Sequence, residues 1–176
     1  MSDTPRRRPP LVVVMGVTGS GKTTVGQALA DHLRLEYADA DTFHSEANVA
    51  KMASGHPLTD EDRAPWLESV GRWLAAHDAS GAVVGCSALR RRYRDVLRAA
   101  APRLVLVHLA GDSGVLTERV AHRPGHFMPA SLVTSQLETL EPLEPDEPGL
   151  VVDLTTPVSD IVRNVAARLD TLGDPA

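Results

Sequence analysis

The sequence contains few aromatic residues, with two Trp, two Tyr and two Phe among its 176 residues. So few flat side chains argue against a surface on which nucleic-acid bases stack. The formal net charge of −5 at pH 7 gives no support to nucleic-acid binding either, because such binding draws on positive charge. We therefore expect no nucleic-acid partner.

Cysteine is nearly absent, since Cys86 is the only one. One cysteine cannot form a disulfide within the chain, which fits a reducing cytosol and a cytoplasmic location. No apolar run approaches the roughly 20 residues that cross a bilayer, so we expect no membrane partner. The apolar run after the arginines and prolines of residues 6–10 is also too short for a secretory signal. We expect a disordered leader at 1–10, a single domain at 11–172 and a loose tail at 173–176.

Short apolar runs alternate with helical patterns along the chain. Because the runs are continuous rather than alternating, they predict strands buried on both faces of a parallel sheet. The predicted strands are residues 11–15, 35–38, 82–86, 104–109 and 150–152. The fold class is therefore α/β, with a parallel five-stranded sheet and helices on both faces. We expect Pro65 in the first turn of a helix and residues 141–148 in a surface loop.

Residues 16–24 read GVTGSGKTT and contain the pattern G-x-x-x-x-G-K-T directly after the first predicted strand. The glycines let backbone N–H groups converge on a polyphosphate, and a helix N-terminus adds partial positive charge. Lys22 can reach the β- and γ-phosphates, and the Thr23 hydroxyl can bind Mg²⁺. The alternative is a glycine-rich turn before a helix. The predicted nucleotide-binding residues are Gly16, Val17, Thr18, Gly19, Ser20, Gly21, Lys22, Thr23 and Thr24.

The second predicted strand leads into Asp39-Ala40-Asp41, followed by Phe43 and His44. Two carboxylates two residues apart point the same way if the backbone stays extended. Beside a phosphate-binding loop, one can hold Mg²⁺ and the other can accept a proton from an attacking hydroxyl. A polar turn is the alternative, but a kinase needs a carboxylate at this place.

Arginines cluster after the third predicted strand and after an acidic run. We interpret Asp60-Glu61-Asp62 as charge at a helix N-terminus, and the planar fork of Arg63 suits a carboxylate. Ser87 is a candidate helix cap, and Arg90 and Arg94 share one helix face. We interpret three further arginines as solvent-exposed charge and the lone cysteine as a small buried residue. These arginines are Arg91, Arg92 and Arg98.

Arg119 and Arg123 lie four residues apart near a predicted helix end, before Pro124-Gly125. Cations followed by a hinge are typical of a lid that closes over phosphates, although charge at a helix C-terminus is the alternative. His122 and His126 have the spacing of a helical metal pair. The proline and glycine between them, and the lack of a third ligand nearby, argue against a histidine-bound metal.

On these motifs the chain resembles the gluconate kinases of the short P-loop type, within the shikimate-kinase-like group. The matching stretches are GVTGSGKTT at 16–24, DADTFH at 39–44, KMASGHPLTDEDRAPWL at 51–67, CSALRRRYRDVLR at 86–98 and RPGHFMPASLVTSQLETLEP at 123–142. The resemblance implies a P-loop kinase fold with a small lid, ATP and Mg²⁺ as cofactors, and D-gluconate as acceptor. It also implies a homodimer.

The resemblance further implies a role for individual residues. Lys22, Asp41 and Arg123 are the expected catalytic residues, Thr23 and Asp39 the metal ligands, and Arg119 a nucleotide contact. Asp41, His44, Arg63, Arg90 and His126 are the expected substrate-binding residues. Ala40 stands where the family has glycine, and Arg90 where it has lysine. Shikimate kinase or another small-acid kinase of the same fold is the near alternative. A GTPase switch would need an N-K-x-D motif, which this sequence lacks.

Overall fold

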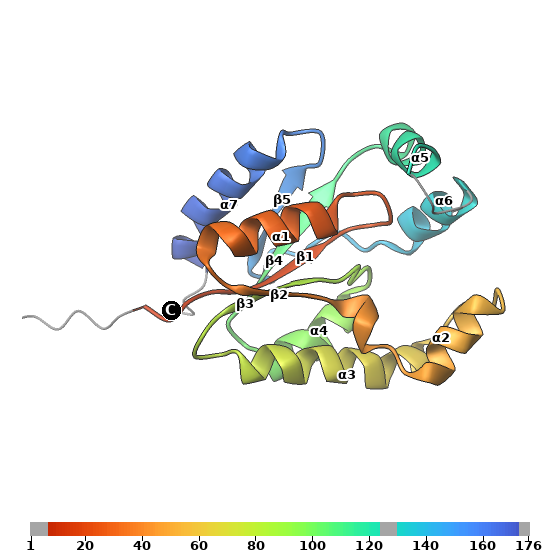
Figure 1. Cartoon of the computed structure of the whole chain (residues 1–176), viewed down its shortest axis with the longest axis horizontal. Coiled ribbons are helices and arrows are strands. Elements are labelled where there is room, and N and C mark those ends of the chain that lie inside the picture. The colour runs from red at the N-terminus through yellow and green to blue at the C-terminus, as the bar shows by residue number, and fades with distance from the viewer. Residues whose placement is uncertain (1–6, 124–129, 173–176) are drawn as a thin grey trace, which may run out of the picture.

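The computed structural model describes residues 7–123 and 130–172. At its centre is a five-stranded sheet in the order β2-β3-β1-β4-β5, and all neighbouring strands are parallel (Figure 1). The strands are β1 (Leu11–Met15), β2 (Glu36–Asp39), β3 (Ala82–Gly85), β4 (Leu104–Ala110) and β5 (Gly149–Asp153). The predicted fold class and the five parallel strands are confirmed.

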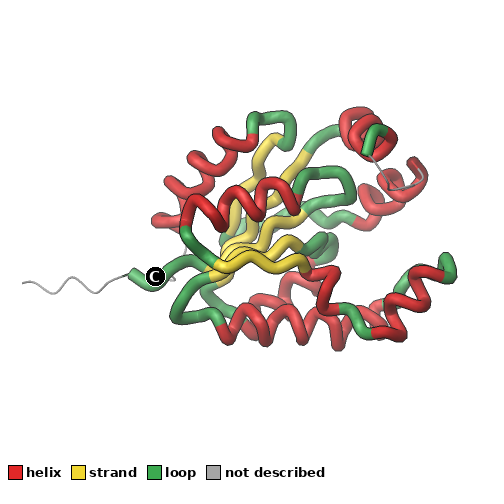
Figure 2. The backbone as a smooth tube through the Cα atoms, in the orientation of Figure 1, coloured by secondary structure: helices red, strands yellow, loops and turns green. Residues whose placement is uncertain are grey.

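Helices cover both faces of this sheet, as predicted. Helices α1 (Lys22–Leu33) and α7 (Val158–Leu172) lie on one face, and α3 (Asp60–Ala76) and α4 (Arg91–Ala100) lie on the other (Figure 2). The shorter elements are a 3-10 helix η1 (Ala40–Phe43), α2 (Glu46–Ala53), α5 (Ser113–Ala121) and α6 (Ala130–Thr139). No helix in the described ranges is long and apolar enough to cross a bilayer.

The burial of strand β1 on both faces of the sheet explains why its sequence is apolar at every position. Val12 and Val14 pack into the core beneath α1 and α7, whereas Leu11, Val13 and Met15 pack into the core beneath α3 and α4. All five side chains are fully buried. A strand that is covered on both faces needs apolar residues at every position, and its carboxyl end carries the glycine loop to the edge of the sheet.

Helix α3 begins at Asp60, so the prediction of Pro65 in a first turn is wrong. Thr59 caps the helix by accepting from the Asp62 N–H (3.1 Å), and the Asp62 carboxylate accepts from the Thr59 N–H (2.8 Å). This reciprocal pair satisfies two N–H groups that a helix otherwise leaves free. Pro65 lies inside the helix, whereas the acidic residues do occupy the first turn, as interpreted.

We expect Thr59→Ala to lower the free energy of unfolding by about 1 kcal/mol, because it removes the capping oxygen. Chemical denaturation monitored by circular dichroism measures this change. Thr59→Ser is the matched control, since it keeps the hydroxyl and should lose much less. Equal losses in the two variants would contradict a role for the hydroxyl.

The residue that caps the N-terminus of helix α4 differs from the one predicted from the sequence. Its N-cap residue is Arg90, which provides no side-chain cap, so the prediction of Ser87 as the cap is wrong. The Glu141 carboxylate, from a distant loop, accepts instead from the Arg91 N–H (2.8 Å).

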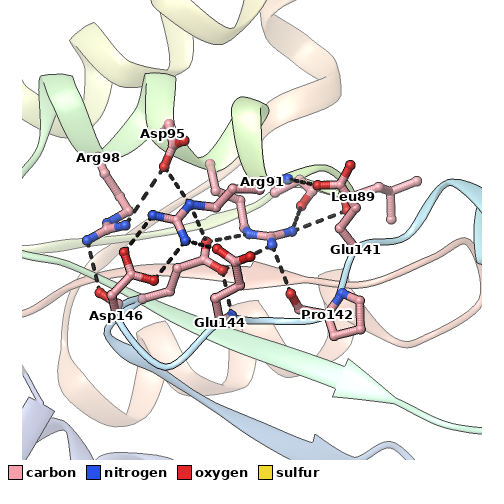
Figure 3. Close-up of polar contacts among 11 residues, drawn as sticks. Leu89, Arg91, Asp95, Arg98, Glu141, Pro142, Glu144 and Asp146 are labelled. Atoms are coloured by element: carbon pink, nitrogen blue, oxygen red, sulfur yellow. Dashed lines mark hydrogen bonds and ion pairs between the residues drawn. The ribbon is translucent and has the colours of Figure 1, made fainter.

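Residues 141–148 form a loop, as predicted, but one of its side chains is buried rather than on the surface. It carries Glu147, which is buried and accepts from the Arg94 Nε (2.7 Å) and Nη2 (3.1 Å). Arg91, expected to be solvent-exposed charge, instead donates to Asp95 and Asp146 and pairs with Glu144 (Figure 3). Ion pairs and hydrogen bonds therefore fasten this loop to α4.

Candidate active site

A cleft of about 440 Å³ opens where β1, β2 and β3 end. Residues from the glycine loop, the end of β2, the end of β3, and helices α5 and α6 line it together. The lining residues are Thr18, Gly19, Gly21, Lys22, Thr23, Thr24, Tyr37, Asp39, Asp41, Gly85, Cys86, Ser87, Arg119, Arg123 and Gln136. The structure thus brings the predicted phosphate loop and the predicted acidic pair into one cavity.

The glycine loop needs left-handed backbone at its glycines. Gly19 has φ 79°, and a Cβ there would lie 2.8 Å from the Val120 side chain of α5. Gly21 has φ 96° and is the N-cap of α1, without a side-chain cap of its own. The first N–H groups of α1 therefore face a cleft rather than a capping side chain, which is the arrangement that binds anions.

Lys22 folds back over the loop that precedes it. Its Nζ donates to the carbonyl oxygens of Gly16 and Val17, each at 3.0 Å. Burial lowers the pKa of Lys22, and the nearby carboxylate of Asp41 opposes that shift. The ammonium is held by neutral oxygens, which leaves its charge free to pair with an anion in the cleft.

The acidic pair lies at the tip of β2. The backbone does not stay extended after Asp39, because Ala40 begins the 3-10 helix η1. Asp39 caps this helix by accepting from the Asp41 N–H (3.0 Å). Both side chains still line the cleft. Desolvation and the neighbouring Asp39 raise the pKa of Asp41, while His44 and Lys22 oppose the shift.

Of the residues predicted to contact the acceptor, Asp41 lines the cleft, whereas His44, Arg63 and Arg90 do not. His44 stacks on Trp66 with ring centroids 4.3 Å apart, and the Trp66 Nε1–H donates to the Ala40 carbonyl (2.7 Å). Burial lowers the pKa of His44, while the charge of Asp41 opposes the shift. His44 is therefore fixed next to the end of the acidic pair.

The guanidinium groups of Arg63 and Arg92 lie over the Tyr93 ring, each 5.6 Å from its centroid. The Arg63 Nη1 donates to the Tyr93 hydroxyl (3.4 Å), and this hydroxyl donates to Asp60 (2.5 Å). Arg92 is exposed, as interpreted, and its guanidinium pairs with Asp60. Arg90 is half-buried, and its Nε is buried without a hydrogen-bond partner among residues 7–123 and 130–172. Unpaired guanidinium donors of this kind suit a carboxylate.

Comparisons with known sequences show the family of the chain. The shikimate kinase family profile matches residues 18–144. A gluconokinase from Gluconobacter oxydans (strain 621H) is 49% identical over 147 residues, which cover 82% of this chain and 83% of that one. The chain belongs to the gluconokinases, within the shikimate kinase family.

Solved structures show the same fold. A gluconokinase from Sinorhizobium meliloti 1021 has a TM-score of 0.85 at 47% identity, covering 96% of this chain and 95% of that one. A shikimate kinase from Acinetobacter baumannii has a TM-score of 0.57 at 18% identity, covering 93% of this chain and 94% of that one. The P-loop kinase fold is therefore confirmed, and the likeness to the gluconokinase is much the greater of the two.

In this gluconokinase, one arginine of the predicted lid lies within α5 and the other lies just after it. Arg119 lines the cleft and donates from Nη2 to the Leu154 carbonyl (2.9 Å), which ties α5 to the loop after β5. Arg123 also lines the cleft, just beyond the end of α5. His126 lies outside the described residues.

Tyr37 and Gln136 line the cleft, although sequence reasoning assigned neither a role. Tyr37 lies against two glycines, since a Cβ at Gly85 would lie 2.6 Å from its hydroxyl and one at Gly26 would lie 2.6 Å from its ring. Gln136 accepts from the Thr18 N–H of the glycine loop (2.6 Å). Gln136 lies within a matched motif, so the motif was the available signal, but its partner could not be read from the sequence.

Cys86 also lines the cleft, and its side chain is buried. Burial raises the pKa of its thiol to about 12, so the nucleophilic thiolate is scarce at neutral pH. Its interpretation as a small buried residue is confirmed.

Proposed function

We propose that the chain transfers the γ-phosphoryl group of ATP to the 6-hydroxyl of D-gluconate, which gives 6-phospho-D-gluconate. One observation carries this proposal: Asp39 and Asp41 line the same cleft as Lys22 and Thr23. An acidic residue beside a phosphate loop suits an alcohol acceptor, whose proton must be removed during transfer. The high identity to gluconokinases supports the choice of acceptor.

The donor half of the reaction uses the glycine loop and α1. The N–H groups at the start of α1 and the Lys22 ammonium would hold the phosphates of ATP. Thr23 and Asp39 offer the hard oxygen ligands that Mg²⁺ prefers, and this ion typically needs only one or two protein ligands beside phosphate and water. The ion would supply neutralisation of phosphate charge. Arg119 would bind the nucleotide, and Arg123 would stabilise negative charge on the transferred group.

The acceptor half uses Asp41, Arg63 and Arg90. Asp41 would accept the proton of the gluconate 6-hydroxyl while the hydroxyl oxygen forms a bond to the γ-phosphorus. At the same time the bond from the γ-phosphorus to the β–γ bridging oxygen would break, and ADP would leave. Arg63 and Arg90 would bind the acceptor's carboxylate, and His44 would contact its hydroxyl groups. His126 remains a proposed substrate contact. Holding the two reactants in line can supply about 7–11 kcal/mol of the barrier.

A coupled ADP-release assay with gluconate, shikimate and several hexoses tests the proposal. We expect gluconate to give the highest kcat/KM, because the arginines favour an acid and neutral hexoses offer no carboxylate. Chelation of Mg²⁺ should abolish turnover, and adding the ion back should restore it. Faster turnover with shikimate would favour the small-acid kinase alternative of the same fold. No turnover with any acceptor would refute the proposal.

A further inference from the structure

Helix α6 and the residues just after it touch both halves of the proposed active site. On the donor side, the Gln136 Oε1 accepts from the Thr18 N–H of the glycine loop (2.6 Å). On the acceptor side, the Glu141 N–H donates to the Leu89 carbonyl (2.7 Å), and the Glu141 Oε2 accepts from the Arg91 N–H (2.8 Å; Figure 3). One short segment therefore contacts the phosphate loop and the start of α4.

The two bonds of Glu141 bracket Arg90. They reach the residue before it and the residue after it, so they fix the backbone from which the Arg90 side chain extends. Arg90 is the N-cap of α4 and has no side-chain cap of its own, so the Glu141 carboxylate is the group that satisfies the next N–H. A carboxylate at a helix N-terminus is also favoured by the helix dipole.

The segment that carries these contacts is itself firmly held. The Leu140 N–H donates to the Gln136 carbonyl (2.9 Å), which continues the helical spacing to the residue before Glu141. The Leu140 side chain packs against the apolar cores on both faces of the sheet. Immediately after Glu141, the Pro142 carbonyl accepts from the buried Arg94 (3.3 Å). Gln136 and Glu141 therefore keep a fixed separation.

The polarity of the Gln136 contact is also defined. A backbone N–H can only donate, so the oxygen of the carboxamide must face Thr18. A phosphate loop works through such N–H groups, and a residue that binds one of them sets the loop's shape.

We propose that Gln136 and Glu141 are positioning residues, which hold the phosphate loop and Arg90 so that donor and acid acceptor are aligned. This inference rests on the proposed function, because it assigns Arg90 to the acceptor's carboxylate. Neither residue needs to touch a reactant. Gln136 acts through Thr18, and Glu141 acts through the backbone on either side of Arg90.

The test compares KM values for the two substrates in matched variants. Glu141→Ala should raise the KM for gluconate about tenfold and leave the KM for ATP within about twofold, because only the acceptor side loses its support. Glu141→Gln keeps an accepting oxygen and should restore the KM for gluconate to within about threefold of the wild type. Gln136→Leu should show the opposite pattern, with a rise in the KM for ATP.

Glu144→Ala is the control for Glu141. Glu144 lies in the same loop and pairs with the Arg91 guanidinium, but it makes neither of the bonds that bracket Arg90. It should leave both KM values unchanged. Thermal unfolding of every variant separates positioning from folding, because a partly unfolded sample loses kcat in proportion to its inactive fraction but keeps its KM.

Two results would overturn the inference. One is an equal KM for gluconate in Glu141→Ala and Glu144→Ala, and the other is an unchanged KM for ATP in Gln136→Leu. A wild-type chain that does not phosphorylate gluconate would refute the proposed function alone. The acceptor KM would then be measured with whichever acid of the panel is turned over.

Discussion

Asp41→Asn is expected to lower kcat for gluconate phosphorylation on the order of 10²–10⁴-fold while ATP still binds. The amide keeps the size of the side chain but cannot take a proton from the acceptor hydroxyl, and a general base contributes a factor of this size. Steady-state kinetics measure kcat, and equilibrium titration with a nucleotide analogue measures binding. Turnover at the wild-type rate would remove Asp41 from the mechanism.

The pH dependence provides a second measure of the same role. Desolvation and Asp39 raise the pKa of Asp41 above the ordinary value of 3.8. A base is active when deprotonated, so kcat/KM should fall as pH drops through this raised pKa, at a higher pH than for an ordinary aspartate. That limb should vanish in Asp41→Asn.

Asp153→Asn is the matched control for Asp41→Asn. Asp153 also ends a strand, β5, but it accepts from the Thr155 N–H (2.8 Å) and hydroxyl (2.7 Å) within its own turn. Asp153 is not one of the residues that line the cleft in the described part of the chain, residues 7–123 and 130–172. We expect it to change kcat little. A loss as large as that of Asp41→Asn would point to a metal-binding role for Asp153.

Glu147→Ala is expected to lower the free energy of unfolding by about 3–5 kcal/mol, because it leaves a buried guanidinium without its counter-charge. The side chains of Glu147 and Arg94 are both fully buried, with the Arg94 Nε 2.7 Å from the carboxylate. Denaturant titration monitored by circular dichroism measures the loss. A loss within the range of exposed pairs would contradict this account.

Two comparisons sharpen this second prediction. Glu144→Ala removes an exposed carboxylate from the same loop and should cost about 1 kcal/mol or less. The double variant Arg94→Met/Glu147→Leu removes both charges, so it should recover much of the stability that Glu147→Ala loses. We therefore expect the large loss of stability in Glu147→Ala to come from leaving the buried Arg94 guanidinium without a partner.

The same pair has a defined pH dependence. Burial opposes ionisation of Glu147, but hydrogen bonds from Arg94 and from the Glu144 N–H outweigh it and hold its pKa below the ordinary 4.5. Its contribution to stability is therefore fully present above pH 4.5 and is lost as pH falls through the lower, folded-state pKa.

The sequence predicted the features that depend on neighbouring residues. A buried strand, a glycine loop and the start of a helix follow one another within residues 11–33, so their pattern alone indicates a phosphate site. The acidic pair was found because it follows directly on a strand. The local shape of the pair could not be predicted, because the turn into η1 depends on Asp39 capping a 3-10 helix.

Contacts between distant residues could not be predicted in this way. Arg94 and Glu147 are 53 positions apart, and nothing near Glu147 marks it as buried. The loop at 141–148 has the composition of a surface turn, yet a guanidinium beneath it draws one of its carboxylates inward. Gln136 and Thr18 are 118 positions apart, and only the fold brings them together. Pro65 misled the interpretation because the Thr59 cap already starts the helix further upstream.

The central place of β1 has a consequence for how the chain is made. Leu11 of β1 pairs with Ala82 of β3 and with Leu104 of β4, and both partners are synthesised after it. At synthesis rates of about 5–20 residues per second, several seconds pass before both partners exist. Until then the apolar stretch LVVVM lacks at least one of its two neighbours in the sheet and is open to chaperones or to aggregation. The centre of the sheet is thus made before the two strands that flank it.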